Sequence, residues 1–403
     1  MSRREEVARR NKTPLDVAFL ITELAPGGAE KALTRLALGL DRARFRPVVY
    51  SLSGRASDRE KSLAPVLRES GIEVVELGAK SALDIPRAFR ALRRNLRRRK
   101  PILLQSFMFH GNLLGRFAGR AAGVPIICSG IRVAERDSRF RLALDRWTKS
   151  LVDVWVCVGE SVAKFTRETG KIPADRVVSI PNGAETIEVG GSIRALTAGG
   201  ALESLEGERA KSAVPEGFGR RKRLIAVGRL APQKGFDWLL ENFPALFDES
   251  TRRDWELWIV GEGPERARLE RIVRERGLEK DVWLAGWRPD VSDLLSESEL
   301  FLLPSRWEGF PNALLEAAAL GVAALCANVE GVEEILGGSE PQIAAPGDVG
   351  EWSRKIAALT GDPALRAELG KRNRARVASE FTNERVVERY ARLWTQLIEE
   401  KLK

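Results

Sequence analysis

Histidine, cysteine and methionine are scarce in this chain of 403 residues, which has one histidine, three cysteines and two methionines. A single histidine and three cysteines that lie far apart in the sequence cannot build a usual transition-metal site. The Asp-x-Asp pair, whose carboxylates suit divalent cations, does not occur anywhere in the chain. These absences predict a protein that works without a bound metal.

Long apolar runs are missing too, since no stretch approaches the roughly 18 residues needed to cross a bilayer. The charged residues 1–6 have no apolar segment close behind them, so we expect no secretion signal. Cys128, Cys157 and Cys326 each lie inside an apolar, strand-like run, which is typical of buried, reduced thiols. We therefore expect a cytoplasmic protein, either soluble or peripheral on the inner face of the membrane.

Positive charge exceeds negative charge by 10, because 66 lysines and arginines stand against 56 aspartates and glutamates. This excess predicts an anionic partner: nucleic acid, an acidic membrane or a phosphorylated small molecule. Residues 87–100 hold eight of the cations. The opposite face of that predicted helix carries apolar residues, namely Ile85, Ala88, Phe89, Leu92 and Leu96. The pattern fits a helix lying on anionic lipid, and it fits equally an outer helix packed on a sheet.

Short apolar runs alternate with amphipathic stretches, and the chain is long enough for two α/β domains. Such alternation predicts parallel sheets covered by helices on both faces, the Rossmann-like arrangement. The predicted strands are 15–21, 47–52, 73–76, 102–106, 125–129, 154–158, 177–180, 224–227, 257–260, 282–285, 300–303 and 322–326. The predicted helices are 28–40, 85–99, 112–122, 238–247, 265–276, 312–320 and 383–402.

The division into domains follows from a loss of strand signal in the middle of the chain, where glycine, alanine, serine and glutamate dominate. We predict an N-terminal Rossmann-like domain at residues 1–184 and a linker at 185–220. A second Rossmann-like domain is predicted at 221–382. The last helix, at 383–403, is expected to cross back to the first domain.

The predicted strand at 224–227 leads into a turn that carries two cations, Arg229 and Lys234. Ligands of open α/β sheets bind beyond the carboxyl ends of the strands. There the fork of an arginine and the ammonium of a lysine can neutralise a diphosphate, which suits a leaving nucleoside diphosphate. Taken alone, two loop cations are more often simply solvated, so the interpretation depends on the motif that follows.

The predicted strand at 300–303 is followed by a glycine-containing turn and a helix, with Glu308 in the turn and Glu316 on the helix. Free backbone N–H groups at the helix start, around residues 310–313, point to the same side. Two carboxylates and these donors can together hold hydroxyls and phosphates. Ordinary surface glutamates are the alternative, and the Gly-Phe-Pro sequence between them argues against it.

Two features of the first domain follow strands as well, at the edge where a parallel sheet meets its ligands. Gly27 and Gly28 join the first strand to its helix and let the backbone come close to a ligand. Many tight turns use such a pair, so the glycines alone are weak evidence. His110, the only histidine, follows the strand at 102–106 and begins a helix.

The two C-terminal motifs resemble those of the retaining glycosyltransferases of family 4 in their order and spacing. That family's hallmark is a pair of glutamates in a Glu-Gly-Phe-Pro-Asn-like loop and helix, preceded by a Gly-Arg-Leu segment that ends in Lys-Gly. The resemblance continues at residues 181–183, 259–264 and 284–287, so it covers most of the chain. It implies a GT-B fold, with two Rossmann-like domains whose parallel sheets face each other across a cleft.

The resemblance also implies roles for individual residues. Arg229 and Lys234 would bind the donor diphosphate, and Glu316 would bind the nucleotide ribose. Glu308 would meet the hydroxyls of the transferred sugar, and His110 would contact the same sugar at the reacting centre without acting as a general base. The backbone of the donor loop would line the sugar pocket; this loop comprises Gly309, Phe310, Pro311 and Asn312. Gly27 and Gly28 would face the donor phosphates and the acceptor.

The function implied is transfer of a hexosyl group, with retention, from a nucleotide-diphosphate sugar to a saccharide or lipid-linked acceptor. No metal cofactor is expected, because cations and helix dipoles would meet the charge of the departing diphosphate. An anionic membrane surface is a further expected partner. Nucleic acid is not, because no aromatic stacking series is interleaved with the basic helix.

Two other interpretations stay open. Nucleotide-sugar epimerases and sugar phosphorylases share the GT-B architecture, although the paired glutamates and the two loop cations favour transfer. An inactive basic module that binds membrane or nucleic acid is the second, and the intact motifs argue against it. Residues 330–335 depart from the family's Gly-Gly-x-Pro-Glu-like turn, and residues 186–220 show no family feature.

Overall fold

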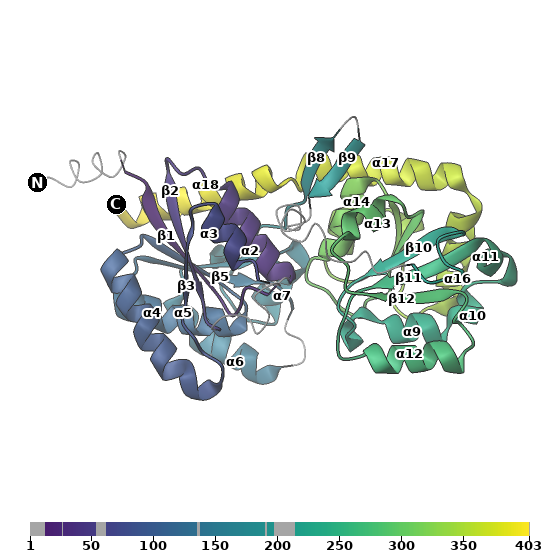
Figure 1. Cartoon of the computed structure of the whole chain (residues 1–403). Helices are drawn as coiled ribbons and strands as arrows, with labels where there is room; N and C mark the ends of the chain where they lie inside the picture. Colours follow the sequence, from purple (N-terminus) through teal and green to yellow (C-terminus); the bar gives the residue numbers. More distant parts are fainter. Residues whose placement is uncertain are drawn as a thin grey trace, which may run out of the picture. The chain divides into compact units, whose positions relative to one another are not determined.

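The structure, a computed structural model, describes residues 13–25, 27–53, 62–134, 138–189, 192–196 and 214–402. The chain divides into two compact units. Unit 1 is Met1–Asn182 together with Asn383–Lys403, and unit 2 is Gly183–Thr382. Each unit has its own parallel sheet with helices on both faces (Figure 1), which is the α/β class predicted from the sequence.

Unit 1 contains a sheet of seven strands in the order β3-β2-β1-β4-β5-β6-β7, and every neighbouring pair is parallel. The order reverses between β1 and β4, and open α/β sheets bind their ligands at the carboxyl edge beside such a switch point. The strands are β1 (Leu15–Ile21), β2 (Phe45–Ser51), β3 (Glu73–Glu76), β4 (Leu103–Phe107), β5 (Ile126–Ile131), β6 (Val154–Cys157) and β7 (Val177–Ser179).

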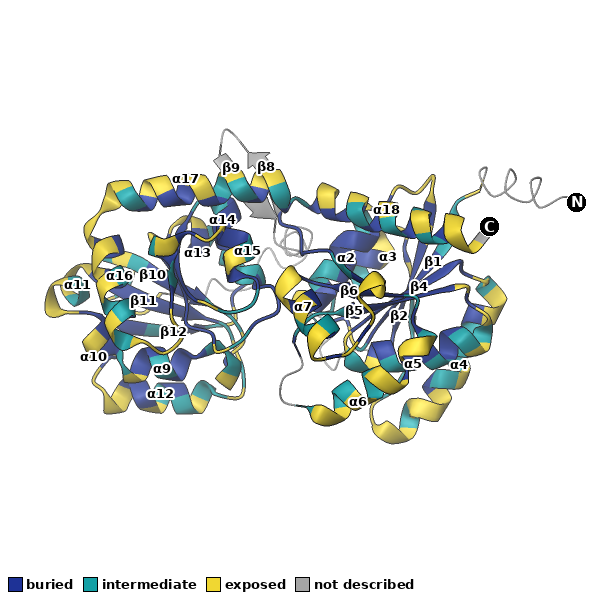
Figure 2. Ribbon diagram, turned by 180° about the vertical axis from the view of Figure 1, so that it is seen from behind, coloured by how far each residue is buried: buried dark blue, intermediate teal, exposed yellow. Residues whose placement is uncertain are grey.

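Side chains of β1 alternate between the two faces of this sheet, and a separate core lies on each face. Phe19 and its neighbours pack against α2 (Gly28–Gly39), α3 (Ala64–Glu69) and α18 (Asn383–Leu402). Leu20 and its neighbours pack against α4 (Ile85–Arg99) and α5 (Phe109–Ala122). Helices α6 (Arg139–Trp147) and α7 (Glu160–Glu168) complete the unit. Figure 2 shows each of the helices α2, α4 and α5 buried on one side and exposed on the other.

The C-terminal helix α18 is part of the core of unit 1. Trp394 on this helix is fully buried, and its ring meets the rings of Phe19 and Phe45 edge-on at centroid distances of 5.9 and 5.7 Å. Tyr390, one turn earlier, adds a third aromatic contact at 5.5 Å. Burial of this cluster ties the end of the chain to the first strands.

The basic helix α4 uses its apolar face inside the protein. Ala88, Leu92 and Leu96 are fully buried against the sheet, and Phe89 packs beside them. Of the two interpretations of this helix, packing on the sheet accounts for these residues. Its cations remain on the outer side.

Unit 2 repeats the arrangement with six parallel strands in the order β12-β11-β10-β13-β14-β15. The order reverses between β10 and β13, which creates a second switch point. The strands are β10 (Lys222–Val227), β11 (Trp255–Val260), β12 (Val282–Gly286), β13 (Leu300–Leu303), β14 (Ala323–Ala327) and β15 (Ile343–Ala344). The helices are α9 (Phe236–Glu241), α10 (Phe243–Leu246), α11 (Glu249–Asp254), α12 (Arg266–Glu275), α13 (Val291–Ser296), α14 (Asn312–Leu320), α15 (Val332–Leu336), α16 (Val349–Gly361) and α17 (Pro363–Glu380).

Two predictions about local structure differ from what is observed. The helix expected at 238–247 is divided into α9 and α10, because Pro244 lacks an N–H group and fits only the first turn of a new helix. The segment expected to be a linker contains an antiparallel hairpin of β8 (Glu185–Val189) and β9 (Ser192–Leu196), which contacts α13 and α14. Residues 190, 191 and 197–213 of that predicted linker lie outside the described residues. Within the described ranges, no helix has both the length and the apolar character needed to cross a membrane.

Candidate active site

The two motifs of the C-terminal half meet at the switch point of unit 2. Arg229 and Lys234 lie in the loop after β10, and Glu308 lies in the loop after β13, the neighbouring strand. The loops touch at Gly235, where a Cβ atom would lie 2.0 Å from the carbonyl oxygen of Pro304. Gly235 also has a φ of +66°, so both the space and the backbone conformation require glycine. Motifs about seventy residues apart are thereby joined.

Lys234 and Glu308 form a largely buried ion pair. Lys234 Nζ lies 2.6 Å from Glu308 Oε1, and the hydroxyl of Ser305 donates to the same oxygen at 2.7 Å. The other carboxylate oxygen, Oε2, lies 3.5 Å from Nε2 of Gln233. A buried carboxylate needs such compensation, because transfer out of water disfavours its charge. The ammonium of Lys234 carries three protons, so it retains donors for an anionic ligand beside the pair.

Arg229 has a different environment from Lys234. Its side chain is exposed and makes no hydrogen bond or ion pair with any described residue of the chain. Its backbone is held in place because the N–H of Leu230 donates to the carbonyl oxygen of Glu262 at 2.9 Å. The guanidinium can therefore turn toward a phosphate without breaking a contact among described residues.

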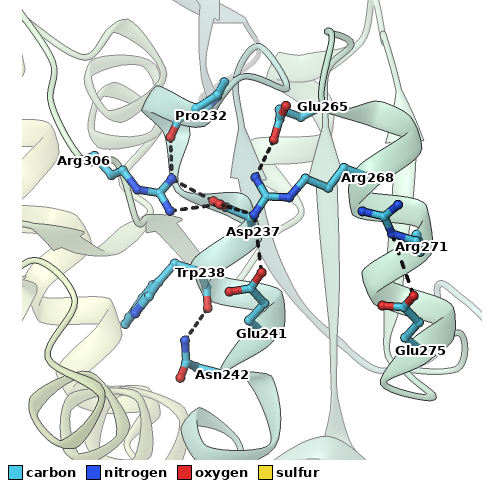
Figure 3. Close-up of polar contacts among 10 residues, drawn as sticks. All are labelled: Pro232, Asp237, Trp238, Glu241, Asn242, Glu265, Arg268, Arg271, Glu275 and Arg306. Carbon is cyan, nitrogen blue, oxygen red and sulfur yellow. Dashed lines mark hydrogen bonds and ion pairs between the residues drawn. The ribbon is translucent and has the colours of Figure 1, made fainter. Parts of the chain in front are cut away.

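A second ion pair fastens the same two loops a few residues away. Arg306, two residues before Glu308, makes a bidentate contact with Asp237 on α9, at 2.7 and 3.0 Å. Figure 3 shows Arg306 also reaching the carbonyl oxygen of Pro232, and Arg268 approaching Asp237 from α12. Burial disfavours the charged carboxylate of Asp237, but the hydrogen bond and charge of Arg306 outweigh it, so its pKa lies below the ordinary value.

A third loop, after β14, completes the site. The backbone N–H of Glu308 donates to the carboxylate of Glu330 at 3.2 Å. Gly331 has a φ of +81°, and a Cβ atom there would lie 2.9 Å from the Cα atom of Phe310. The loop that departs from the family's glycine-rich turn therefore packs directly on the predicted donor loop, and it places an additional carboxylate there.

The helix that follows the donor loop carries Glu316. Pro311 precedes α14, Asn312 is its first residue, and Glu316 is buried on its second turn. The ring of Phe310 is buried against Phe381, at a centroid distance of 5.5 Å. That ring has a packing role, so only the backbone of Gly309, Phe310 and Pro311 is left for the predicted sugar pocket.

The glycine loop of unit 1 holds a carboxylate of the protein itself. Glu30 accepts hydrogen bonds from its own N–H and that of Ala29, and a Cβ atom at Gly27 would lie 2.4 Å from Glu30 Oε2. Burial raises the pKa of Glu30, and the backbone hydrogen bonds and the charge of Arg132 oppose this rise only in part. Gly27 and Gly28 thus lie where predicted, after β1, and the first N–H groups of α2 are used by Glu30. Pro26 lies outside the described residues.

His110 lies in the first turn of α5, at the carboxyl edge of the same sheet. Its side chain is exposed, and its ring meets that of Phe109 edge-on at 5.4 Å. The helix start is fixed by buried Asn112, whose amide donates to the carbonyl oxygen of Gly130 at 2.9 Å. Met108, just before the helix, has φ 66° and ψ 155°, a conformation that is essentially reserved for glycine. Strain of this kind clusters at functional sites.

Several residues of this site were not singled out from the sequence. Gln233, Ser305 and Glu330 contact Glu308, and Arg306 with Asp237 fastens its loop. A usable signal existed for Arg306 and Ser305, which stand inside the recognised motif. Glu330 begins the segment that departs from the family's turn, but its contact with Glu308 depends on how β14 lies beside β13. Within the described part of the chain, no group of three or more histidine, cysteine, aspartate or glutamate side chains could hold a metal ion.

The two units and their switch-point loops place the chain in the class of two-domain α/β proteins of the GT-B type. Two family models match it: "Glycosyltransferase Family 4" at residues 26–187 and "Glycosyl transferases group 1" at residues 221–362. Together the models cover most of both units. The chain belongs to this family of glycosyltransferases, which confirms the resemblance to glycosyltransferases of the GT-B type.

Among curated relatives, an exopolysaccharide phosphotransferase of Streptomyces coelicolor is 31% identical over 46% of this chain and 20% of its own length. A UDP-Gal:alpha-D-GlcNAc-diphosphoundecaprenol alpha-1,3-galactosyltransferase of Escherichia coli is 26% identical over 59% of this chain and 60% of its own length. The chain thus spans less than two thirds of these relatives. The crystal structure of HepE from Anabaena with UDP-glucose has a similar fold, with a TM-score of 0.76 at 17% identity over 95% of this chain and 100% of that one.

Proposed function

We propose that this protein transfers a hexosyl group from a nucleotide-diphosphate sugar to a saccharide or lipid-linked acceptor, with retention of the anomeric configuration. The observation that carries the proposal is the Lys234–Glu308 pair at the switch point of unit 2, with the exposed Arg229 in the same loop as Lys234. A cation pair suits the diphosphate, and a carboxylate held at a fixed place suits the hydroxyls of a sugar.

The proposed reaction breaks the bond between the anomeric carbon and the diphosphate oxygen of the donor. The acceptor hydroxyl oxygen forms the new bond on the same face, and its proton passes to the departing diphosphate. Lys234 and Arg229 stabilise the negative charge that develops on that diphosphate, so the proposal requires no metal ion. Glu308 holds the sugar hydroxyls, and its pairing with Lys234 and Ser305 keeps its position before the donor arrives.

The remaining site residues take supporting roles in the proposal. Glu316, on the second turn of α14, binds the ribose of the nucleotide. The backbone of Gly309, Phe310 and Pro311 lines the sugar, and Glu330 holds the amide of Glu308 in place. His110, exposed at the edge of unit 1, contacts the donor sugar, and the loop of Gly27 and Gly28 serves the acceptor or the phosphates.

The donor nucleotide and the place of action are proposed from the relatives. The Escherichia coli relative is named for a UDP-sugar donor and a diphosphoundecaprenol acceptor. A UDP-sugar is therefore the first donor to test, and a lipid-linked acceptor fits the outward cations of α4 and the net charge of +10. We place the protein in the cytoplasm, peripheral on the inner face of the membrane.

The proposal is tested with purified protein, UDP-, GDP- and ADP-sugars and a chelator, by following thermal shift and slow release of nucleoside diphosphate. We expect one nucleotide to stabilise the protein, and Lys234→Ala and Glu316→Ala to abolish that effect. Lys371→Ala, which removes an exposed lysine from α17, is the matched control and should bind normally. Absence of binding to all three nucleotides would overturn the proposal. Activity only with added metal would overturn its metal independence. Nuclear magnetic resonance of the product distinguishes retention from inversion.

A further inference from the structure

Large apolar side chains that face water are unevenly distributed over the described residues. There are seven such exposed side chains among the described residues, and five of them belong to unit 1. All five lie on the segment that forms α4, α5 and α6 or on the turns that begin these helices. The five are Leu83, Ile85, Met108, Phe140 and Trp147. We call them the α4–α6 rim. Leu83 is 91% exposed, and Phe140 and Trp147 are each 72% exposed. Exposed apolar residues that lie together mark interaction surfaces, whereas single ones are common.

Topology explains why four of these residues lie near one edge of the sheet, whereas Trp147 is the last residue of α6. Helices α4, α5 and α6 follow β3, β4 and β5, so each helix begins at the carboxyl edge of the parallel sheet. The three helices lie side by side in both views (Figures 1 and 2). Contacts confirm this order, since Arg93 of α4 donates to the carbonyl oxygen of Ala121, and Arg116 of α5 lies 2.6 Å from Asp145 of α6.

Helix α6 shows an apolar stripe of its own. Phe140, Ala143 and Trp147 are exposed at spacings of three and four residues, which puts them on one face of the helix. Trp147 also rests against Phe117 of α5, with ring centroids 6.0 Å apart. None of the residues of α6 is buried, although the helix is amphipathic. An apolar stripe of Phe and Trp beside arginines is typical of helices that lie on a membrane surface.

The surroundings of the rim are positively charged. Lys80, Arg87 and Arg90 are exposed around the start of α4, and Arg139 is exposed at the start of α6. Asp84, at the start of α4, pairs with Arg87 at 3.2 Å while accepting the N–H groups of Lys80 and Ser81. Arg90 and Arg139 have no carboxylate partner among the described residues. Farther along α4, Arg94, Arg97 and Lys100 add exposed cations.

We propose that the α4–α6 rim docks the protein on an anionic lipid bilayer. Aromatic and aliphatic side chains enter the interface between head groups and acyl chains, and the flanking cations meet anionic head groups. Charge complementarity favours this occupant over a second copy of the chain, which would bring like charges together.

What docking means for the acceptor rests on the proposed function. His110 and Met108 lie at the start of α5, inside the rim, and Arg141 of α6 covers the ring of Phe109 at 4.9 Å. A bilayer docked there presents its head groups at the edge of unit 1 that carries His110. The acceptor is then a lipid-linked sugar that stays in the membrane while its head group is glycosylated.

The test uses the full chain and sedimentation with vesicles of phosphatidylcholine alone, or of phosphatidylcholine and phosphatidylglycerol in equal parts. We expect binding only to the anionic vesicles, weakened by high salt. The double variant Phe140→Ser/Trp147→Ser should bind the anionic vesicles more weakly by a factor of about ten or greater, because two large apolar side chains are lost. Trp287→Ser, which removes an exposed tryptophan from unit 2, is the matched control and should bind as the unchanged protein does.

Equal binding by the double variant, equal binding to both vesicle types, or no binding at all would overturn the docking proposal. A dimer in solution that the double variant abolishes would overturn it as well, by assigning the rim to a second copy. Nucleotide-induced thermal shift in the double variant separates the two proposals. A retained thermal shift together with lost vesicle binding supports docking. Vesicle binding by a protein that binds no nucleotide sugar overturns the proposed function alone.

Discussion

Lys234 Nζ lies 2.6 Å from Glu308 Oε1, and this contact joins loops that follow two neighbouring strands of unit 2. Both side chains are largely buried, and the hydroxyl of Ser305 adds a second donor to the same oxygen. The two charges hold each other at the place where a donor would bring a third charge. Under the proposed function, donor binding and stability are therefore coupled at this pair.

The coupling predicts an asymmetric response to mutation. Lys234→Ala leaves the carboxylate of Glu308 buried without its cation, so it should lower the free energy of unfolding of unit 2 by about 3 kcal/mol. Lys234→Ala/Glu308→Gln should lose less than Lys234→Ala alone, because the uncompensated charge is gone. Urea unfolding of both variants measures the difference. Equal stability of the single and the double variant would contradict a charge pair.

The Arg306–Asp237 contact predicts a pH dependence. The pKa of Asp237 in the folded protein lies below its ordinary value of 3.8, so its ionised form adds stability above that pH. The contribution is lost as the pH falls through the lowered pKa. The stability advantage of the unchanged protein over Asp237→Asn should therefore be full at about pH 7 and shrink below about pH 4. A difference that does not depend on pH would exclude the ionised carboxylate as its cause.

Met108 should be replaceable by glycine with a gain in stability. Its backbone angles suit glycine, and strain of this kind costs about 1–3 kcal/mol. Glycine relieves the strain, but its greater conformational entropy in the unfolded chain offsets part of the gain. We expect Met108→Gly to raise the unfolding free energy of unit 1 by about 1 kcal/mol. Met108→Ala keeps the strain and serves as the control, with no gain expected. Chemical denaturation of both variants gives the comparison.

Trp394 should be essential for unit 1 and irrelevant for unit 2. It is fully buried against Phe19 and Phe45, and loss of a buried tryptophan destabilises by about 3–5 kcal/mol. Trp394→Ala should shift the unfolding transition of unit 1 alone. Trp147→Ala removes an exposed tryptophan of the same unit, and a change within about 0.5 kcal/mol is expected. Equal shifts for the two variants would show that α18 is not part of that core.

Much of the fold was predictable because local sequence patterns report burial directly. Apolar runs of four to seven residues mark β1, β11 and β13 within a residue or two, since a strand covered on both faces must be apolar along its length. The hairpin of β8 and β9 was missed, because its residues lack that apolar run and its pairing is antiparallel. The division of α9 from α10 was missed through Pro244.

The apolar face of α4 shows where such patterns stop being informative. Ala88, Leu92 and Leu96 satisfy the requirements of a lipid-facing helix and of a sheet-facing helix equally well. Only the position of α4 beside β2 and β4 in the core decides that they are buried. The exposed stripe of α6 could not be inferred either, since amphipathicity does not reveal which helices remain uncovered.

The sequence alone determined that two parallel α/β units exist and that Arg229, Lys234, Glu308 and Glu316 follow strands in a glycosyltransferase pattern. Strand periodicity and motif spacing are local properties, so they survive without coordinates. Contacts between distant segments were decided only by the tertiary structure. The order β10 beside β13 beside β14 pairs Lys234 with Glu308 and brings Glu330 to the backbone N–H of Glu308. Strand order sets which loops meet, and spacing along the chain does not specify strand order.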